Sequence, residues 1–261
     1  MIISRTPLRI SFVGGGSDLP AFYEREAGAV VSTTINRYIY ITVNPKFDRR
    51  IRASYSQTEI VDRVDDLQHE LIREALKVTG IDGAIEITSI SDIPSRGTGL
   101  GSSSGYTVGL LNALHAYTGR LAGAERLARE ACMVEIERCG RPIGKQDQYG
   151  VAYGGLKYLS FQPDGSVIVE PILCEPGAKQ RLERSLLLLY TGQTRRAESI
   201  LAEQSRNSLT DEATRAGLRR MVALAGQLRE ALNRGQLDGF GDILHANWLE
   251  KRRLATGITN P

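Results

Sequence analysis

Glycine and serine are concentrated in residues 94–105, PSRGTGLGSSSG, directly after a predicted strand and directly before an apolar helix. Glycine lets the backbone come close to a phosphate group, and the N–H groups in the first turn of a helix attract anions. A serine hydroxyl in this place could also ligate Mg²⁺. The segment lacks the lysine of a Walker A loop and the acidic partner of a dinucleotide fingerprint. Its spacing predicts a phosphate-binding loop, and a capped helix after a flexible turn is the alternative.

A second glycine-rich turn lies near the N-terminus, in residues 7–18, PLRISFVGGGSD. Arg9 lies within a strand that is otherwise apolar, where a cation needs a partner or a ligand. Asp18 follows the turn and could accept hydrogen bonds from the hydroxyls of a sugar, or it could cap the next helix. Taken alone, the residue pattern favours the cap.

Carboxylates flank a glycine- and proline-containing loop in residues 135–148, EIERCGRPIGKQDQ. Glu135, near the end of a predicted helix, could reach a metal ion held by the serine loop. Asp147, in the loop, could accept a proton from a hydroxyl group. Phosphoryl transfer needs a phosphate cradle, Mg²⁺, a positioned acceptor and a balancing cation, and the three segments offer a candidate for each. For any single carboxylate, a solvated position on a helix surface is the alternative.

The composition is that of an ordinary globular protein, with 261 residues of which 41% are hydrophobic and 24% charged. A net charge of +3 and an aromatic content of 6% argue against a nucleic-acid-binding protein, including an RNA-binding one. The three cysteines form no CxxC pair, so neither a disulfide framework nor a zinc site is expected. The N-terminus has no long apolar run, which favours a cytoplasmic location without a signal peptide or membrane span.

Hydrophobic periodicity predicts strands mixed with helices, which is typical of the α/β or α+β class. Strands are expected at residues 2–13, 29–44, 83–90, 155–161, 166–172 and 185–192. Helices are expected at residues 64–79, 103–117 and 123–139, and over most of the chain after residue 192 to about residue 255. In the first of these helices Leu67, Leu71 and Leu76 share one face, and Gly80 ends it. A change in composition near residues 172–180 predicts a domain boundary.

The three segments, taken together and in this order, resemble the GHMP kinase superfamily, which includes galactokinase, homoserine kinase, mevalonate kinase and phosphomevalonate kinase. PLRISFVGGGSD resembles the first family motif, and PSRGTGLGSSSG closely resembles the second, Pro-x-x-x-Gly-Leu-Gly-Ser-Ser. GKQDQYGVAYGG and LLYTGQTRRAESIL most resemble the bacterial sugar kinases that act on D-glycero-D-manno-heptose 7-phosphate. The resemblance covers essentially the whole chain.

The resemblance implies an ATP- and Mg²⁺-dependent kinase that transfers the γ-phosphoryl group to a sugar hydroxyl, most closely the anomeric hydroxyl of heptose 7-phosphate. Asp147 would be the catalytic base and Arg9 its balancing cation, while Ser103 and Glu135 would ligate Mg²⁺. Spacing matches Glu135 to the metal ligand better than Glu137. The residues implied for ATP are Gly97, Gly99, Leu100, Gly101, Ser102, Ser103, Ser104 and Gly105, and those for the sugar are Asp18, Gly16, Ser17 and Gly154.

The resemblance also implies two domains with the active site between them. Residues 1–172 would be an N-terminal domain like domain 2 of ribosomal protein S5, and residues 173–261 would be part of a ferredoxin-like C-terminal domain. The third, glycine-rich motif of the family has no counterpart in this sequence. We therefore expect a C-terminally shortened member of the family, and whether this shortened chain is active stays open.

Several alternatives and partners follow from the same residues. The chain could phosphorylate another sugar, of the galactose or fucose type, or it could be a non-catalytic ligand-sensing module on the same fold. The expected partners are ATP and a sugar or sugar phosphate, without nucleic acid or membrane. Arg195 and Arg196 are candidates, on charge alone, for a second anion site that would bind a phosphorylated sugar, and an exposed helix start is equally compatible with them. Nothing in the sequence predicts the oligomeric state.

Overall fold

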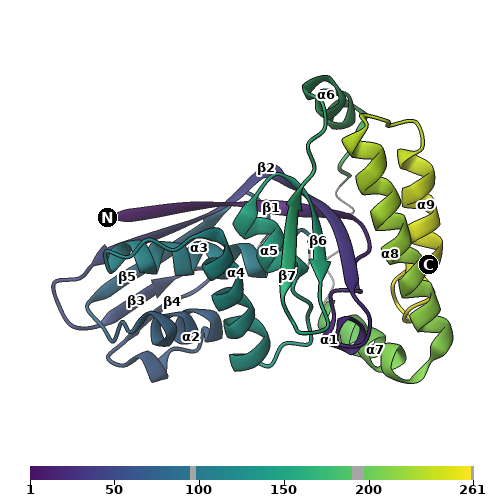
Figure 1. The fold of residues 1–261 in the computed structure, drawn as a ribbon. Coiled ribbons are helices and arrows are strands. Elements are labelled where there is room, and N and C mark those ends of the chain that lie inside the picture. The colour runs from purple at the N-terminus through teal and green to yellow at the C-terminus, as the bar shows by residue number, and fades with distance from the viewer. Residues whose placement is uncertain (95–97, 190–196, 260–261) are drawn as a thin grey trace. The chain divides into compact units, whose positions relative to one another are not determined.

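The computed structural model describes residues 1–94, 98–189 and 197–259, and the chain forms two compact units (Figure 1). Unit 1 contains residues 1–9, 34–141 and 147–154, and unit 2 contains residues 10–33, 142–146 and 155–261. Two long strands, β1 (Ile2–Val13) and β2 (Gly28–Pro45), contribute residues to both units. The division does not follow chain order, and the domain boundary expected after residue 172 stays a prediction.

Unit 1 is built on a mixed β-sheet. Its strands follow the order β4 (Thr58–Val61), β3 (Ile51–Ser54), β5 (Ile85–Ser91) and β2, and β1 pairs with β2. β5 runs antiparallel to β2 and parallel to β3. The predicted strands at the positions of β1, β2 and β5 are confirmed. The four-residue strands β3 and β4 were not predicted, because so short a stretch shows too little periodicity to identify it.

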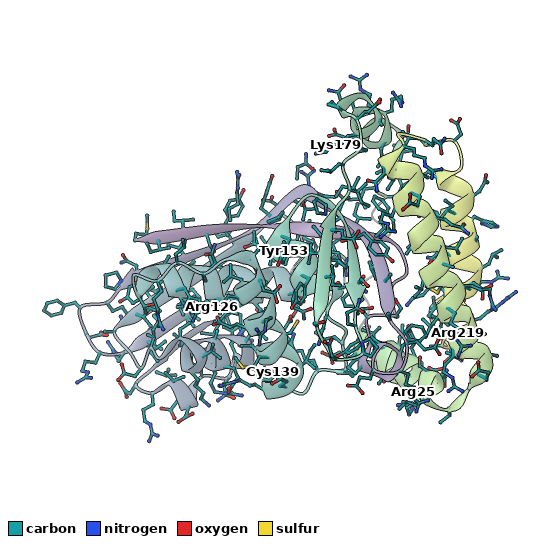
Figure 2. The ribbon with its side chains drawn as sticks, viewed as in Figure 1. Arg25, Arg126, Cys139, Tyr153, Lys179 and Arg219 are labelled. Carbon is teal, nitrogen blue, oxygen red and sulfur yellow. The ribbon has the colours of Figure 1, made fainter. Side chains whose placement is uncertain are left out.

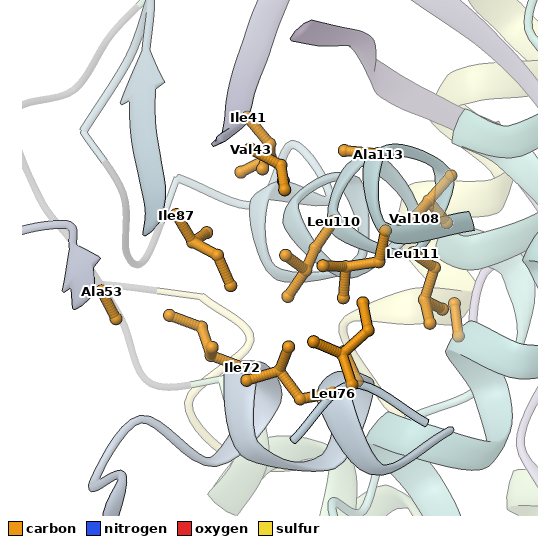
Figure 3. Close-up of a cluster of buried hydrophobic side chains, with 14 of the residues drawn as sticks. Ile41, Val43, Ala53, Ile72, Leu76, Ile87, Val108, Leu110, Leu111 and Ala113 are labelled. Carbon is orange, nitrogen blue, oxygen red and sulfur yellow. The ribbon is translucent and has the colours of Figure 1, made fainter. Parts of the chain in front are cut away.

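Three helices of unit 1 surround its hydrophobic core: α2 (Glu70–Thr79), α3 (Ser102–Tyr117) and α4 (Ala124–Cys132). The core combines aliphatic side chains of the sheet with those of α2 and α3, as Figure 3 shows. Its labelled members include Ile41, Val43, Ile72, Leu76, Ile87, Val108 and Leu110. Most residues of α3 are buried, which explains why its sequence is apolar on nearly every face.

Two predicted helices are present with changed boundaries. The segment expected as a helix from residue 64 contains a short 3₁₀ turn, η1 (Val64–Asp66), followed by α2, whose first turn is capped by His69. Gly80 ends α2 in a left-handed conformation with φ 73°, as predicted. The helix expected over residues 123–139 is α4, which continues directly into a π-helical turn, η2 (Met133–Arg138).

Unit 2 combines antiparallel strands with helices. The first part of β2 pairs with β6 (Leu156–Phe161), which pairs with β7 (Val167–Pro171). Its helices are α1 (Pro20–Tyr23), α6 (Pro176–Ser185), α7 (Ala197–Thr210), α8 (Glu212–Asn233) and α9 (Phe240–Lys251). The core includes Phe12 and Phe240, whose ring centroids lie 5.2 Å apart in an edge-to-face arrangement. On the surface Arg219, labelled in Figure 2, donates to the Glu26 carboxylate at 2.6 Å.

One predicted strand, at residues 185–192, is wrong in the part that the structure describes. Ser185 ends α6, and residues 186–189 form no strand. The side chains of Leu187 and Leu189 are 87% and 81% exposed. A short run of leucines has the composition of a buried strand whether or not a partner strand is available to it. Residues 190–192 lie outside the described residues.

The other predicted strands and helices of unit 2 are confirmed. β6 and β7 lie within a residue or two of the expected positions, and the chain from residue 197 to about residue 255 is mainly helical. No helix in the described ranges is both long enough and apolar enough to cross a lipid bilayer.

Candidate active site

The predicted phosphate loop is an open turn in front of α3. Gly99 and Gly101 have φ of 71° and 73°, a left-handed conformation that favours glycine. A Cβ added to Gly99 would meet nothing within 4 Å, and one added to Gly101 would lie 3.2 Å from Arg9 Cγ. Gly101 is the N-cap of α3 and no side chain caps the helix, so its first amides can serve an anion. The predicted ligand Gly97 lies outside the described residues.

Small residues place α3 directly on β1. The Ser4 hydroxyl donates to the carbonyl oxygen of Gly109 at 2.7 Å, and a Cβ on Gly109 would lie 2.6 Å from the Thr6 hydroxyl. A Cβ on Gly105 would be 3.4 Å from the side chains of Leu8 and Ile39. This close approach requires glycine and fixes the first turn of α3 beside the strand that carries Arg9.

Arg9 connects the phosphate loop with Asp147. Its Nε and Nη2 donate to the same oxygen, Asp147 Oδ1, at 2.7 and 2.5 Å. Its Nη1 donates to the carbonyl oxygen of Gly99 at 2.7 Å, and its backbone N–H donates to Leu100 O at 3.1 Å. The buried cation in the apolar strand therefore has the partner that it needs. The structure brings Arg9, Asp147 and the loop together within unit 1.

Glu135 is the centre of a buried polar cluster. Its carboxylate is 0% exposed and accepts from the hydroxyls of Ser103 at 2.5 Å and Ser104 at 2.7 Å. The Gln148 side-chain amide donates to Oε2 at 2.7 Å. Arg141 Nη1 donates to Ser103 Oγ at 2.5 Å and lies 3.4 Å from Glu135 Oε1. Burial raises the pKa of Glu135, while these hydrogen bonds and the charge of Arg141 oppose the rise.

Two local features hold the carboxylates in place. Glu135 lies in the π-helical turn η2, where the Cys139 N–H donates to the Val134 carbonyl, five residues earlier, at 3.0 Å. Asp147 lies in the first turn of α5 (Gln146–Tyr153), whose two tyrosines are stacked. The hydroxyl of Tyr153, labelled in Figure 2, donates to Glu125 of α4 at 2.9 Å. These contacts fix α5 to the rest of unit 1.

The Ser103 and Glu135 oxygens suit Mg²⁺. Protein Mg²⁺ sites use hard oxygen ligands, often one or two carboxylates completed by phosphate oxygens and water. The described residues hold no group of three or more His, Cys, Asp and Glu side chains, so water molecules or nucleotide oxygens would supply the further ligands of such a site. At a metal–oxygen distance of about 2.1 Å, neighbouring octahedral ligands lie about 3.0 Å apart. Ser103 Oγ and Glu135 Oε1, 2.5 Å apart, would separate slightly to admit the ion.

Asp18 lies in unit 2 and does not cap the next helix along the chain, α1, so the alternative favoured by the residue pattern alone is wrong. The N-cap of α1 is Leu19, and no side chain caps it. Asp18 is 2% exposed and accepts from Gly16 N at 2.8 Å. It also accepts from the backbone and side-chain nitrogens of Gln146, both at 3.2 Å. Asp18 thus fixes the residue that precedes Asp147 in the chain.

The other residues predicted to contact the sugar are parts of turns. Ser17 is fully buried, and its hydroxyl donates to Gly14 O at 2.8 Å and accepts from Ala29 N at 3.0 Å. Gly16 has φ 109°. Gly154, in unit 1, follows α5 with φ 66° and no atom within 4 Å of an added Cβ. Sugar contacts of these residues stay predictions.

Several residues of the site were not predicted. They are Arg141, Gln146 and Gln148, all within the segment 135–148 in which only the carboxylates were singled out. Gln148 immediately follows the predicted base, and this adjacency was the only available signal. The predicted anion-site residues Arg195 and Arg196 lie outside the described residues.

Comparison with known proteins gives the same family. Residues 67–155 match the family model for the GHMP kinases N terminal domain. The chain is 28% identical, over 99% of its length and 79% of the relative, to the D-glycero-alpha-D-manno-heptose 7-phosphate kinase of Campylobacter jejuni. It is 26% identical to the L-fucokinase/L-fucose-1-P guanylyltransferase of Bacteroides fragilis, over 100% of this chain and 31% of that protein.

Solved structures show the same fold. A D-glycero-D-manno-heptose 1-phosphate kinase from Bacteroides thetaiotaomicron has a TM-score of 0.82 at 26% identity, over 97% of this chain and 80% of the other. Streptococcus pneumoniae phosphomevalonate kinase, at 16% identity, shows the fold alone, with a TM-score of 0.79 over 100% of this chain and 83% of the other. The predicted α/β class and GHMP kinase fold are confirmed. Residues 67–155 thus match the N-terminal domain of the GHMP kinases, and the chain shares the fold of their solved structures.

Proposed function

We propose that this protein is an ATP- and Mg²⁺-dependent kinase that transfers the γ-phosphoryl group of ATP to a hydroxyl of a heptose phosphate. The observation that carries the proposal is the pairing of Ser103 with the buried Glu135 at the first turn of α3, with Arg9 and Asp147 beside the same loop. A hydroxyl–carboxylate pair, helix amides without a side-chain cap and a charge-balanced aspartate are the parts that phosphoryl transfer uses.

Each part has a separate task in the proposed reaction. The first-turn amides of α3 and the backbone at Gly99 and Gly101 would bind the phosphate oxygens. Bound Mg²⁺, held by Ser103 and Glu135, would neutralise charge on the transferring phosphoryl group. Asp147 would accept the proton of the sugar hydroxyl at Oδ2, because both hydrogen bonds from Arg9 go to Oδ1 and fix the orientation of the carboxylate.

The sugar is inferred from relatives. Two of them, from Campylobacter jejuni and Bacteroides thetaiotaomicron, are named as heptose phosphate kinases and differ in the phosphate position that their names give. We propose Asp18 as an acceptor for a sugar hydroxyl, supported by its link through Gln146 to the residue next to Asp147. Gly16, Ser17 and Gly154 are proposed neighbours of the sugar, and Arg195 and Arg196 a proposed second anion site. The proposed location is the cytoplasm.

The experiment measures ADP release with heptose 7-phosphate, heptose 1-phosphate, galactose, fucose and mevalonate as acceptors. Asp147→Asn should lower kcat by about 10³-fold, because general-base catalysis contributes roughly that much, and leave ATP affinity nearly unchanged. Asp82→Asn removes an equal charge from an exposed position of unit 1 and should behave as wild type. Full activity in Asp147→Asn would contradict the proposed base. ATP binding without ADP release for any acceptor would favour a ligand-sensing module, and activity on galactose or fucose alone would replace the proposed acceptor.

A further inference from the structure

Arg141 lies beside both proposed metal ligands and has no role in the reaction described above. Its Nη1 is 2.5 Å from Ser103 Oγ and 3.4 Å from Glu135 Oε1. Glu135 is fully buried, whereas the Arg141 side chain is 23% exposed, so the guanidinium reaches the carboxylate from the solvent side. Among the described residues, Arg141 therefore supplies the positive charge next to the Ser103–Glu135 pair.

A guanidinium and a divalent cation compete for this position. The Ser103 hydroxyl donates its one proton to Glu135 and accepts from Arg141 with one of its two lone pairs, so a metal ion bound there would have to share this oxygen with the guanidinium. A metal ion bound to the same two oxygens would also lie within a few ångströms of the guanidinium, in a partly buried place where repulsion between like charges is strong. The repulsion makes the two cations compete for the pair.

The chain around Arg141 allows the side chain to leave. The Arg141 backbone N–H donates to the Glu135 carbonyl at 3.1 Å, which fixes the main chain at the end of η2. Gly140, with φ 65°, provides the preceding turn. The partly exposed side chain can therefore rotate into solvent about its own χ angles, while the backbone and Glu135 stay in place.

We propose that Arg141 is the resident counter-ion of the Ser103–Glu135 pair and is displaced from it when a divalent cation binds. This inference rests on the proposed function, in which Ser103 and Glu135 ligate Mg²⁺. Arg141 stabilises the metal-free protein by neutralising a buried carboxylate, and by the same contact it weakens the binding of the metal ion. It sets the Mg²⁺ concentration at which the site becomes active.

The experiment measures Mn²⁺ binding, as a probe for Mg²⁺, by electron paramagnetic resonance without nucleotide. Arg141→Gln keeps a hydrogen-bond donor but removes the charge, and it should bind Mn²⁺ at least about fivefold more tightly than wild type. The metal-free variant should also melt at a lower temperature, and Mg²⁺ should raise its melting temperature by more than that of wild type. Unchanged or weaker Mn²⁺ binding by Arg141→Gln, or no binding to either protein, would overturn the inference.

Two further variants separate the possible causes. Arg138→Gln removes a positive charge three residues away, where the guanidinium pairs with Glu74 at 3.5 Å. It should bind Mn²⁺ as wild type does, and an effect as large as that of Arg141→Gln would show a general charge effect and overturn the inference. Glu135→Gln tests the proposed metal ligand itself. If Glu135→Gln binds as wild type, the metal site of the proposed function fails. If it loses Mn²⁺ while Arg141→Gln is unchanged, only the role of Arg141 fails.

Discussion

Two glycine-rich turns of this protein look alike in the sequence and differ in their surroundings. Both contain glycines with positive φ, at Gly14 and Gly16 in unit 2 and at Gly99 and Gly101 in unit 1. A Cβ on Gly14 would lie 1.9 Å from the Ala29 carbonyl oxygen, and one on Gly16 would lie 2.0 Å from the Gln204 side chain. A Cβ on Gly99 would meet nothing within 4 Å.

The difference shows that a glycine pattern in the sequence indicates the backbone conformation. It does not indicate whether protein atoms or a ligand will occupy the space beside the turn. In the first turn protein atoms fill the space, and Lys251 Nζ completes the packing by donating to Gly15 O and Gln204 Oε1, both at 2.9 Å. In the second turn no atom of the described residues fills the space beside Gly99, which suits a loop that receives a ligand. We therefore expect substitutions in the first turn to affect folding and those in the second to affect nucleotide binding.

The largest expected effect is on the packed turn. Gly14→Ala should lower the free energy of unfolding by about 4 kcal/mol, because it adds left-handed strain to a backbone clash. Urea unfolding measures the change. Gly155→Ala is the control, since Gly155 has φ 71° and no atom within 4 Å of an added Cβ, so that it isolates the strain. Equal losses for the two variants would show that packing does not distinguish the turns.

A smaller effect on stability is expected from Lys251, the last residue of α9, which donates to the same turn at Gly15 O. Burial lowers its pKa to about 8, despite the opposing influence of Asp18. In the unfolded chain the lysine keeps its ordinary pKa of about 10.4. Between about pH 8 and about pH 10.4 the unfolded state therefore binds more protons than the folded state. Stability should therefore rise with pH in this window, by about 2 kcal/mol from pH 8 to pH 10. Lys251→Met should show a flatter pH profile by urea unfolding, and an identical slope in both proteins would contradict the assignment.

The smallest effect on stability is expected in the open loop. Gly99→Ala should cost about 1 kcal/mol, from left-handed strain alone. Its affinity for ATP, measured by titration calorimetry, should fall clearly, because the loop amides would no longer keep their positions. Gly119→Ala has the same φ of 71° and equally open space at the far end of α3, so it should lose similar stability and keep its ATP affinity. Unchanged ATP binding by Gly99→Ala would argue against a phosphate loop.

The sequence allowed the long elements and the charged members of the site to be predicted. β1, β2 and α3 have strong periodicity, and Arg9 was identified because an arginine in an apolar strand needs a partner. The interactions of Arg141 with Ser103 and of Gln148 with Glu135 could not be predicted. The partners lie 38 and 13 positions apart in the chain, and no local pattern links them. Asp18 was misread as a cap because its partner, Gln146, lies 128 positions away and no local pattern indicates it.

The π-helical turn η2 makes the direction of Glu135 depend on the length of the chain as much as on its residue types. Successive residues of an α-helix are rotated by about 100°, and a π turn accommodates one residue more than an α turn does. Deleting one residue between Met133 and Arg138 would replace the π turn by an α turn and change the direction in which Glu135 points. In descendants of this sequence, this segment can exchange its exposed residues but must keep their number.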